Sequence, residues 1–187
     1  MLLSQMDKYV TDADGFIVQE KGRGYHLMHM AAKHDRIEYI ETNKKFVNIA
    51  GKYYGDTPLH VVVAYNRPVT TLKTLIRCGA NIDAKDALGM TPLMHACGSY
   101  EQERRIESLL VHKADINADS KIGKTSLMKA AWFGVVGNVR LLVDGGAKIG
   151  VVQTGGHKDC GKSAIDMCRD PECRDMLERA RKFQEST

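Results

Sequence analysis

The sequence is poor in residues that interrupt or cross-link a chain. Its 187 residues include only four prolines and five cysteines, with no low-complexity tract. Few prolines and an unbiased composition argue against long disordered regions. Because an odd and sparse set of cysteines makes no disulfide framework, we expect reduced thiols in an intracellular protein.

Two further features are absent, a long apolar run and a strong excess of acidic or basic residues. The longest branched apolar stretch, residues 61–64, is far shorter than the roughly 18 residues that span a membrane. The first residues lack the basic and apolar regions of a secretory signal, so we expect none. The 27 Lys and Arg against 23 Asp and Glu leave a charge of +4, too evenly spread to predict nucleic-acid binding. We expect a cytoplasmic protein, with the nucleus as the alternative location, that binds neither membrane nor nucleic acid.

One short motif returns along the chain at a nearly constant interval. Gly-x-Thr-Pro-Leu begins at Gly55 and at Gly89, and Gly-x-Thr-Ser-Leu begins at Gly123, with a spacing of 34 residues in both steps. Weaker copies begin at Gly24 and, after a longer spacing of 38 residues, at Gly161. A period of this length indicates stacked supersecondary units, none of which can bury its apolar face alone.

Within each unit the residue types predict two helices followed by a polar turn. The Thr of the motif can cap the free N–H groups of a first helix, and Pro suits the position after it. Small pairs such as Ala130-Ala131 let a neighbouring helix approach closely, and an apolar stripe such as Val139, Leu141 and Leu142 predicts the buried face of a second helix. Gly79 and Gly146 stand where that second helix must end in a left-handed conformation.

These motifs resemble the ankyrin repeat family. The resemblance depends on GDTPLH, GMTPLM, GKTSLM, the small pairs, GANIDAKD and KADINADS, and it covers roughly residues 23 to 182. It implies an all-α solenoid of about five helix-turn-helix repeats with β-hairpin tips. The expected repeats lie near 23–54, 55–88, 89–122, 123–160 and 161–187, after an N-terminal extension or cap at 1–22. The hairpin at 149–160 is about five residues longer than the family pattern.

The resemblance also implies where a partner protein binds, on a concave face formed by hairpin tips and first helices. The expected contact residues are Tyr53, Tyr54, Asp56, Tyr65, Lys85, Leu88, Met90, Ile122, Lys124, Trp132 and Phe133. Aromatic residues in such places are typical of interface hot spots. The alternative is that Trp132 and Phe133 fold back onto a neighbouring repeat or the long hairpin. The small Gly98-Ser99 step predicts a notch for a partner's apolar side chain.

One stretch matches a phosphate-binding motif letter for letter. Residues 156–163 fit G-x-x-x-x-G-K-[ST], in which Lys162 would reach phosphate oxygens and Ser163 would hold Mg²⁺. However, Gly161 to Ser163 also stand where the repeat pattern demands Gly-x-Thr, and a phosphate-loop fold needs a parallel sheet. Nucleotide binding by this loop is therefore an alternative function.

Other residues that carry chemistry fit structural roles better. The His and Cys residues from 157 to 173 match no familiar pair of zinc-ligand doublets, so we expect no metal. His29 and His60 occupy the TPLH histidine, which in the resembled family makes structural hydrogen bonds. Asn117 resembles a substrate of ankyrin asparaginyl hydroxylation, and a role in stabilising its own turn is the favoured interpretation.

The sequence thus predicts a non-catalytic protein–protein interaction module that acts as a scaffold, adaptor or inhibitor. We expect no catalytic residue, no cofactor and no small-molecule substrate. A narrower alternative is a regulator like the inhibitor-of-NF-κB family, which would mask a transcription factor. That alternative depends on Thr57 to His60 followed by Asn66 to Pro68, a similarity confined to one repeat.

Overall fold

The computed structural model describes residues 11, 13–16, 24–155 and 158–186. In this part of the chain the regular elements are ten α-helices and a short 3₁₀ helix, with isolated β-bridges in place of extended strands. The expected all-α repeat fold is confirmed. None of these helices is both long and apolar enough to cross a membrane. The chain divides into two compact units, residues 1–88 and 89–187, which are described in turn.

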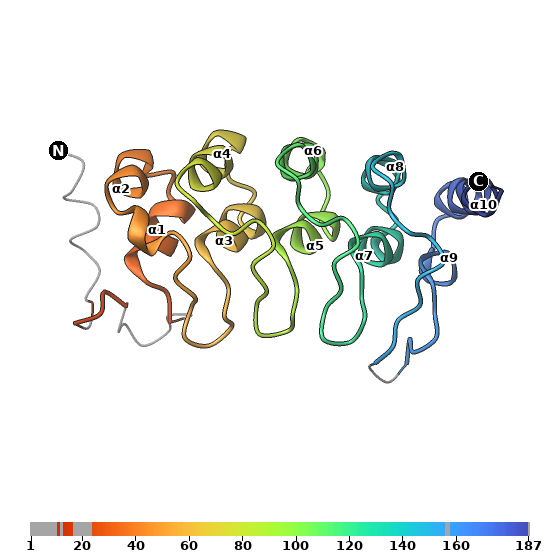
Figure 1. The fold of residues 1–187 in the computed structure, drawn as a ribbon, viewed down its shortest axis with the longest axis horizontal. Helices are drawn as coiled ribbons and strands as arrows, with labels where there is room; N and C mark the ends of the chain where they lie inside the picture. The colour runs from red at the N-terminus through yellow and green to blue at the C-terminus, as the bar shows by residue number, and fades with distance from the viewer. Residues whose placement is uncertain (1–10, 12, 17–23, 156–157, 187) are drawn as a thin grey trace. The chain divides into compact units, whose positions relative to one another are not determined.

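Unit 1 contains two helix pairs. They are α1 (Leu27–Lys33) with α2 (Ile37–Thr42) and α3 (Pro58–Ala64) with α4 (Val69–Arg77), and η2 (Lys44–Phe46) follows the first pair. Helix α1 packs on α2 and α3, and α4 packs on α2 and α3. The loops extend from the α1 and α3 side of the unit (Figure 1). Its core contains the fully buried side chains of Met28, Ile40, Leu59, Leu72 and Leu75.

Unit 2 contains three helix pairs. They are α5 (Pro92–Cys97) with α6 (Glu103–Val111), α7 (Ser126–Phe133) with α8 (Val136–Asp144), and α9 (Ala164–Met167) with α10 (Pro171–Glu185). Helices α5, α7 and α9 pack in one row, and α6, α8 and α10 pack in a second row (Figure 1). Its core contains the buried side chains of Leu93, Ile106, Leu109, Leu127 and Leu142.

The first helices begin with the caps that the motif predicts. Thr91 Oγ1 accepts a hydrogen bond from the Met94 amide, and Thr125 Oγ1 accepts one from the Met128 amide, each at 3.3 Å. In the last repeat, the Ser163 amide donates to the Asp166 carboxylate at 2.8 Å. The Asp166 amide donates back to Ser163 Oγ at 3.4 Å, which completes a capping box.

The second helices end in the left-handed region, as the glycine positions predict. Gly79 has φ +93° and Gly146 has φ +87°. At the matching position after α6 stands Lys113, with φ +68°. A side chain costs energy in this region, so the third repeat carries local strain that the glycine repeats avoid.

Single antiparallel β-bridges close the hairpins that precede α7 and α9. Asp119 pairs with Thr125, and Val152 pairs with Ser163. The second pair encloses five more residues than the first, which agrees with the extra length predicted for the last hairpin. Near the N-terminus, Phe16 pairs with His26, and its ring meets the His26 ring edge-on at 5.5 Å between centroids. This described part of the predicted 1–22 extension therefore lies against the first repeat, and residues 1–10, 12 and 17–22 lie outside the described residues.

Candidate protein-binding surface

We use the name hairpin face for the surface that, within each unit, consists of the hairpin tips and the exposed ends of the first helices. Among the described residues of unit 1, the large hydrophobic side chains exposed on this face are Tyr53 (69% exposed), Tyr54 (59%) and Leu88 (67%). Lys85 beside them is also exposed. The Ala87 amide donates to the Tyr54 carbonyl at 2.8 Å, so two successive tips are held together by the backbone. The side chains are thus presented by an ordered loop pair.

Tyr65 lies at the end of α3 and is half-buried. The Lys33 ammonium lies 4.3 Å from the centroid of its ring, a cation–π contact between α1 and the end of α3. The aromatic ring expected at this position is therefore already paired with a cation of the preceding repeat.

Asp56 differs from the other predicted contact residues. Its side chain is only 9% exposed and accepts a hydrogen bond from the Tyr25 hydroxyl. A buried carboxylate that is hydrogen-bonded inside the unit offers little surface to another protein. Asp56 is therefore left out of the surface proposed below.

Trp132 lies at the end of α7 and is half-buried. The Arg169 guanidinium lies 4.1 Å from the centroid of its ring, and the Lys124 ammonium lies 5.6 Å away. The ring thus contacts the last repeat in part, as the alternative interpretation expects. Sequence reasoning missed Arg169, because its repeat is the weakest copy of the motif. One signal was available in the sequence: Arg169 directly follows Cys168, and Cys168 aligns with Ala130 of the preceding repeat.

The notch predicted at Gly98 is occupied. A Cβ atom placed on Gly98 would lie 2.9 Å from Lys129 Cε and 3.2 Å from Phe133 Cε2. The Phe133 side chain is still 46% exposed, so it fills the space beside Gly98 and keeps one side in solvent. A partner would therefore meet the Phe133 ring in place of an open notch.

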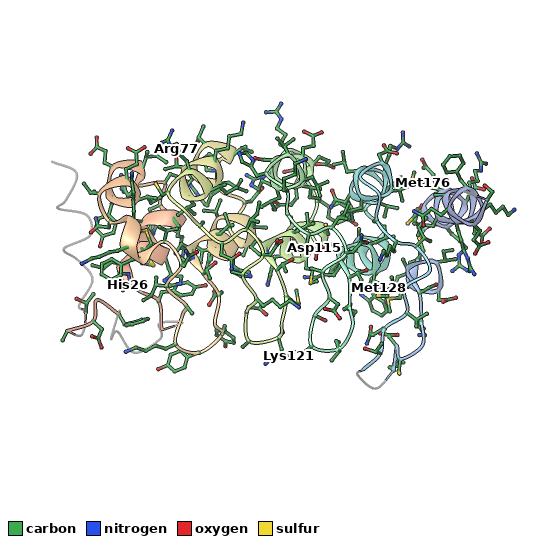
Figure 2. The ribbon with its side chains drawn as sticks, viewed as in Figure 1. His26, Arg77, Asp115, Lys121, Met128 and Met176 are labelled. Carbon is green, nitrogen blue, oxygen red and sulfur yellow. The ribbon has the colours of Figure 1, made fainter. Side chains whose placement is uncertain are left out.

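The remaining predicted residues of unit 2 lie on or next to the hairpin tips. Ile122 is exposed at the tip that precedes α7, and Met90 and Lys124 are half-buried. Lys121 marks the same tip in Figure 2, away from Met128 on α7. The tip contacts the following hairpin, since the Gly155 amide donates to the Ile122 carbonyl at 3.0 Å.

The phosphate-loop motif makes other contacts. Gly156 and His157 lie outside the described residues. The Lys162 ammonium lies 2.8 Å from Asp159 Oδ1, and this hydrogen bond is the main reason why the pKa of Asp159 is lowered. Ser163 Oγ donates to Asp166 at the start of α9, a helix of four residues. Both residues that would hold a nucleotide therefore have roles within the repeat.

Comparison with known proteins agrees with this architecture. The family description "Ankyrin repeats (3 copies)" matches residues 60–153, half of the chain. The chain belongs to the ankyrin repeat family. Ankyrin repeats are protein–protein interaction modules, generally without catalytic activity.

Three relatives show how widely these ankyrin repeats are shared. The chain is 33% identical over 112 residues to Neurogenic locus notch homolog protein 1 of Mus musculus, and the match covers 59% of this chain and 4% of the relative. It is 38% identical over 100 residues to B-cell lymphoma 3 protein homolog of Mus musculus, and the match covers 53% of this chain and 22% of the relative. It is 36% identical over 104 residues to Ankyrin repeat and SOCS box protein 6 of Homo sapiens, and the match covers 52% of this chain and 24% of the relative. The chain thus spans less than a quarter of the length of each of these relatives.

The buried cysteines of these ankyrin repeats serve as small core residues. Cys97, Cys168 and Cys173 are buried, and none of the five cysteines is in a disulfide. Burial raises the pKa of the Cys97 thiol to about 12 and also raises that of Cys173. The Cys97 and Cys173 thiols are therefore protonated at neutral pH, a state in which thiols are poor nucleophiles and poor metal ligands.

Asn117 makes the contacts expected of a turn residue. Its amide donates to Asp115 Oδ1 at 2.9 Å, and its side-chain oxygen accepts the Lys148 amide at 2.8 Å. Asn48 does the same in unit 1, where its oxygen accepts the Asn81 amide at 2.7 Å. Each asparagine therefore joins the loops after two successive second helices.

His29 makes unit 1 sensitive to acid. Its Nδ1 accepts the His26 amide at 3.1 Å, so Nε2 carries the proton and donates to the Asp56 carbonyl at 2.8 Å. Burial lowers the pKa of His29 below 6.5. Below about pH 6.5 the unfolded chain binds a proton that the folded chain resists, so the free energy of unfolding falls by up to about 1.4 kcal/mol per pH unit.

Urea denaturation of the wild type and His29→Gln at several pH values measures this effect. We expect the wild type to be the more stable at pH above about 7, and the difference to narrow as the pH falls towards about 5. A difference that stays constant over this range would show that His29 does not titrate in this way.

Proposed function

We propose that this chain is a non-catalytic recognition module whose protein partner docks on the hairpin face. The supporting observation is that large side chains are left in solvent on this face of each unit, Tyr53, Tyr54 and Leu88 in unit 1 and Phe133 in unit 2. Membership of the ankyrin repeat family supports the same conclusion. Exposed aromatic and aliphatic side chains held on ordered tips are the usual anchors of protein interfaces.

The proposed binding mode depends on hairpin tips that are already ordered before the partner binds. Backbone hydrogen bonds hold neighbouring tips together, at Ala87–Tyr54 in unit 1 and Gly155–Ile122 in unit 2. Because the tips are already ordered, little conformational entropy is lost on binding. Exposed charges such as Lys85 and Lys121 steer the partner, while the aromatic residues anchor it. The proposed contacts are Tyr53, Tyr54, Tyr65, Lys85, Leu88, Met90, Ile122, Lys124, Trp132 and Phe133.

Affinity capture from an extract of the source organism tests this proposal. Three forms of the full chain serve as bait: wild type, Tyr65→Ala/Trp132→Ala, and the control Val111→Ser/Phe183→Ser. The control removes exposed apolar side chains from α6 and α10, outside the hairpin face. We expect a protein that wild type and control recover, and that the hairpin-face variant loses.

A second variant separates lost binding from lost folding. Tyr53→Ser/Tyr54→Ser changes exposed side chains only, so thermal unfolding followed by circular dichroism should match that of the wild type. Equal recovery of the same protein by wild type and both hairpin-face variants would contradict the proposed surface. Recovery lost only in the Val111/Phe183 control would place the interface on the second helices.

A narrower regulatory role is the second candidate. It is supported by the 38% identity to B-cell lymphoma 3 protein homolog, although the other relatives are almost as similar. For a protein with this regulatory role we propose a cytoplasmic location, with the nucleus as the alternative. The test is direct binding of the purified chain to a Rel-type transcription factor. Binding lost in Tyr65→Ala/Trp132→Ala supports it, and no binding contradicts it.

A further inference from the structure

We infer that unit 2 recognises an acidic segment of its partner that also carries an apolar side chain, and that this segment docks on the Trp132 patch. The patch consists of Lys124, Trp132, Phe133, Lys158 and Arg169. The inference rests on the function proposed above and adds the chemistry of the partner to it.

Two cations make cation–π contacts with the Trp132 ring. The Arg169 guanidinium lies 4.1 Å from the ring centroid and the Lys124 ammonium 5.6 Å from it, and they come from different repeats. Cation–π attraction holds each of them near the indole, but like charges gathered on one ring repel each other. A carboxylate placed beside them relieves this repulsion and gains two charge-assisted contacts.

The long hairpin adds further positive charge beside Lys124. Lys162 and, more weakly, Lys124 and Lys158 lower the pKa of Asp159, so three lysines lie near this carboxylate. Asp159 already bonds to Lys162 at 2.8 Å. A surface in which cations outnumber the carboxylates attracts an acidic partner and speeds its association.

The other carboxylates of this region are used within the fold. Asp166 bonds to Ser163 at the start of α9, and Asp170 Oδ1 accepts the Cys173 amide at 2.9 Å at the start of α10. Both carboxylates keep their negative charge, but in the part of the chain that the structure describes their oxygens bond to Ser163 and Cys173 and not to Lys124 or Arg169.

The apolar component follows from Phe133. Phe133 follows Trp132 in α7, its side chain is 46% exposed, and its ring lies against Gly98. A purely anionic ligand would leave this ring in water, whereas an acidic segment with one apolar side chain covers both features. A nucleic-acid base fits less well, because Arg169 already lies over the indole ring on which a base would stack.

Selection of random peptides displayed on phage, with the full chain as target, tests the inference. We expect the selected peptides to be rich in Asp and Glu and to carry a Leu, Phe or similar residue. For a selected peptide, we expect Lys124→Gln/Arg169→Gln to weaken binding about tenfold or more, and higher salt to weaken it further. Fluorescence anisotropy with the labelled peptide measures both effects.

A matched variant controls for the loss of net charge. Arg140→Gln/Lys148→Gln removes the same two charges from α8 and the loop after it, and both residues are exposed. We expect this control to change the affinity less than about twofold. Thermal unfolding of both double variants, followed by circular dichroism, verifies that they fold like the wild type.

The possible failures can be told apart. Selected peptides without an acidic excess, or acidic peptides that bind equally well to Lys124→Gln/Arg169→Gln, would overturn the inference and leave the proposed function standing. Polyglutamate that binds as tightly as a selected peptide would overturn its apolar part. A chain that selects no peptide and captures no protein would contradict the proposed function itself.

Discussion

Leu109→Ala is expected to lower the free energy of unfolding of unit 2 by about 2–5 kcal/mol. Leu109 lies on α6, is fully buried, and belongs to a helix that packs on both α5 and α8. Truncation removes the transfer free energy of the side chain and leaves a cavity in a closely packed core. In a repeat protein, stability depends on interfaces between neighbours, so this loss should also uncouple the helix pairs that follow α6.

Urea denaturation followed by circular dichroism measures the effect. Leu142→Ala on α8, at an equally buried position, should behave in the same way. Leu110→Ala on α6 is the control, because Leu110 is only half-buried and should cost less. A change below about 1 kcal/mol for both Leu109→Ala and Leu142→Ala would mean that these residues do not form the core of the repeats.

Gly123→Ala is expected to destabilise unit 2 by about 2–4 kcal/mol, from two separate causes. Gly123 has φ +72°, a conformation in which a side chain is strained. A Cβ atom there would also lie 2.7 Å from the backbone nitrogen of Thr154, in the next hairpin. Because backbone cannot move aside as a flexible side chain can, the two hairpins would have to separate.

Gly146→Ala isolates the first of these causes. Gly146 has φ +87°, but a Cβ atom on it would meet no other atom within 4 Å. We therefore expect only the conformational cost, about 1–2 kcal/mol. Thermal unfolding of the two variants compares them directly. Equal destabilisation would show that hairpin contact adds nothing to the strain at Gly123.

The repeat fold could be predicted because its signals are local. Thr91 and Thr125 cap helices that begin with the next residue, and each cap depends only on the following turn of backbone. Gly79 and Gly146 adopt positive φ for an equally local reason, since a helix that ends in a tight turn needs this conformation. The period of 34 residues then repeats these local signals in register.

The candidate surface could be predicted only in part. A hairpin tip projects away from the helices, so the exposure of Tyr53, Tyr54 and Leu88 follows from their place in the repeat. The burial of Asp56 does not follow from it. Asp56 is buried together with Tyr25, whose hydroxyl donates to its carboxylate across 31 residues of sequence, and no local pattern encodes that contact.

The class of fold, the places where helices begin and end, and the exposure of the hairpin tips all follow from the amino-acid sequence alone. Which side chains meet across the repeats follows from the tertiary packing. Arg169 lies over Trp132, and Phe133 fills the space beside Gly98, although a whole repeat separates the members of each pair along the chain. Such contacts depend on how far each side chain reaches across the stack of repeats. Residue type and spacing do not specify that reach, whereas the packed backbone does.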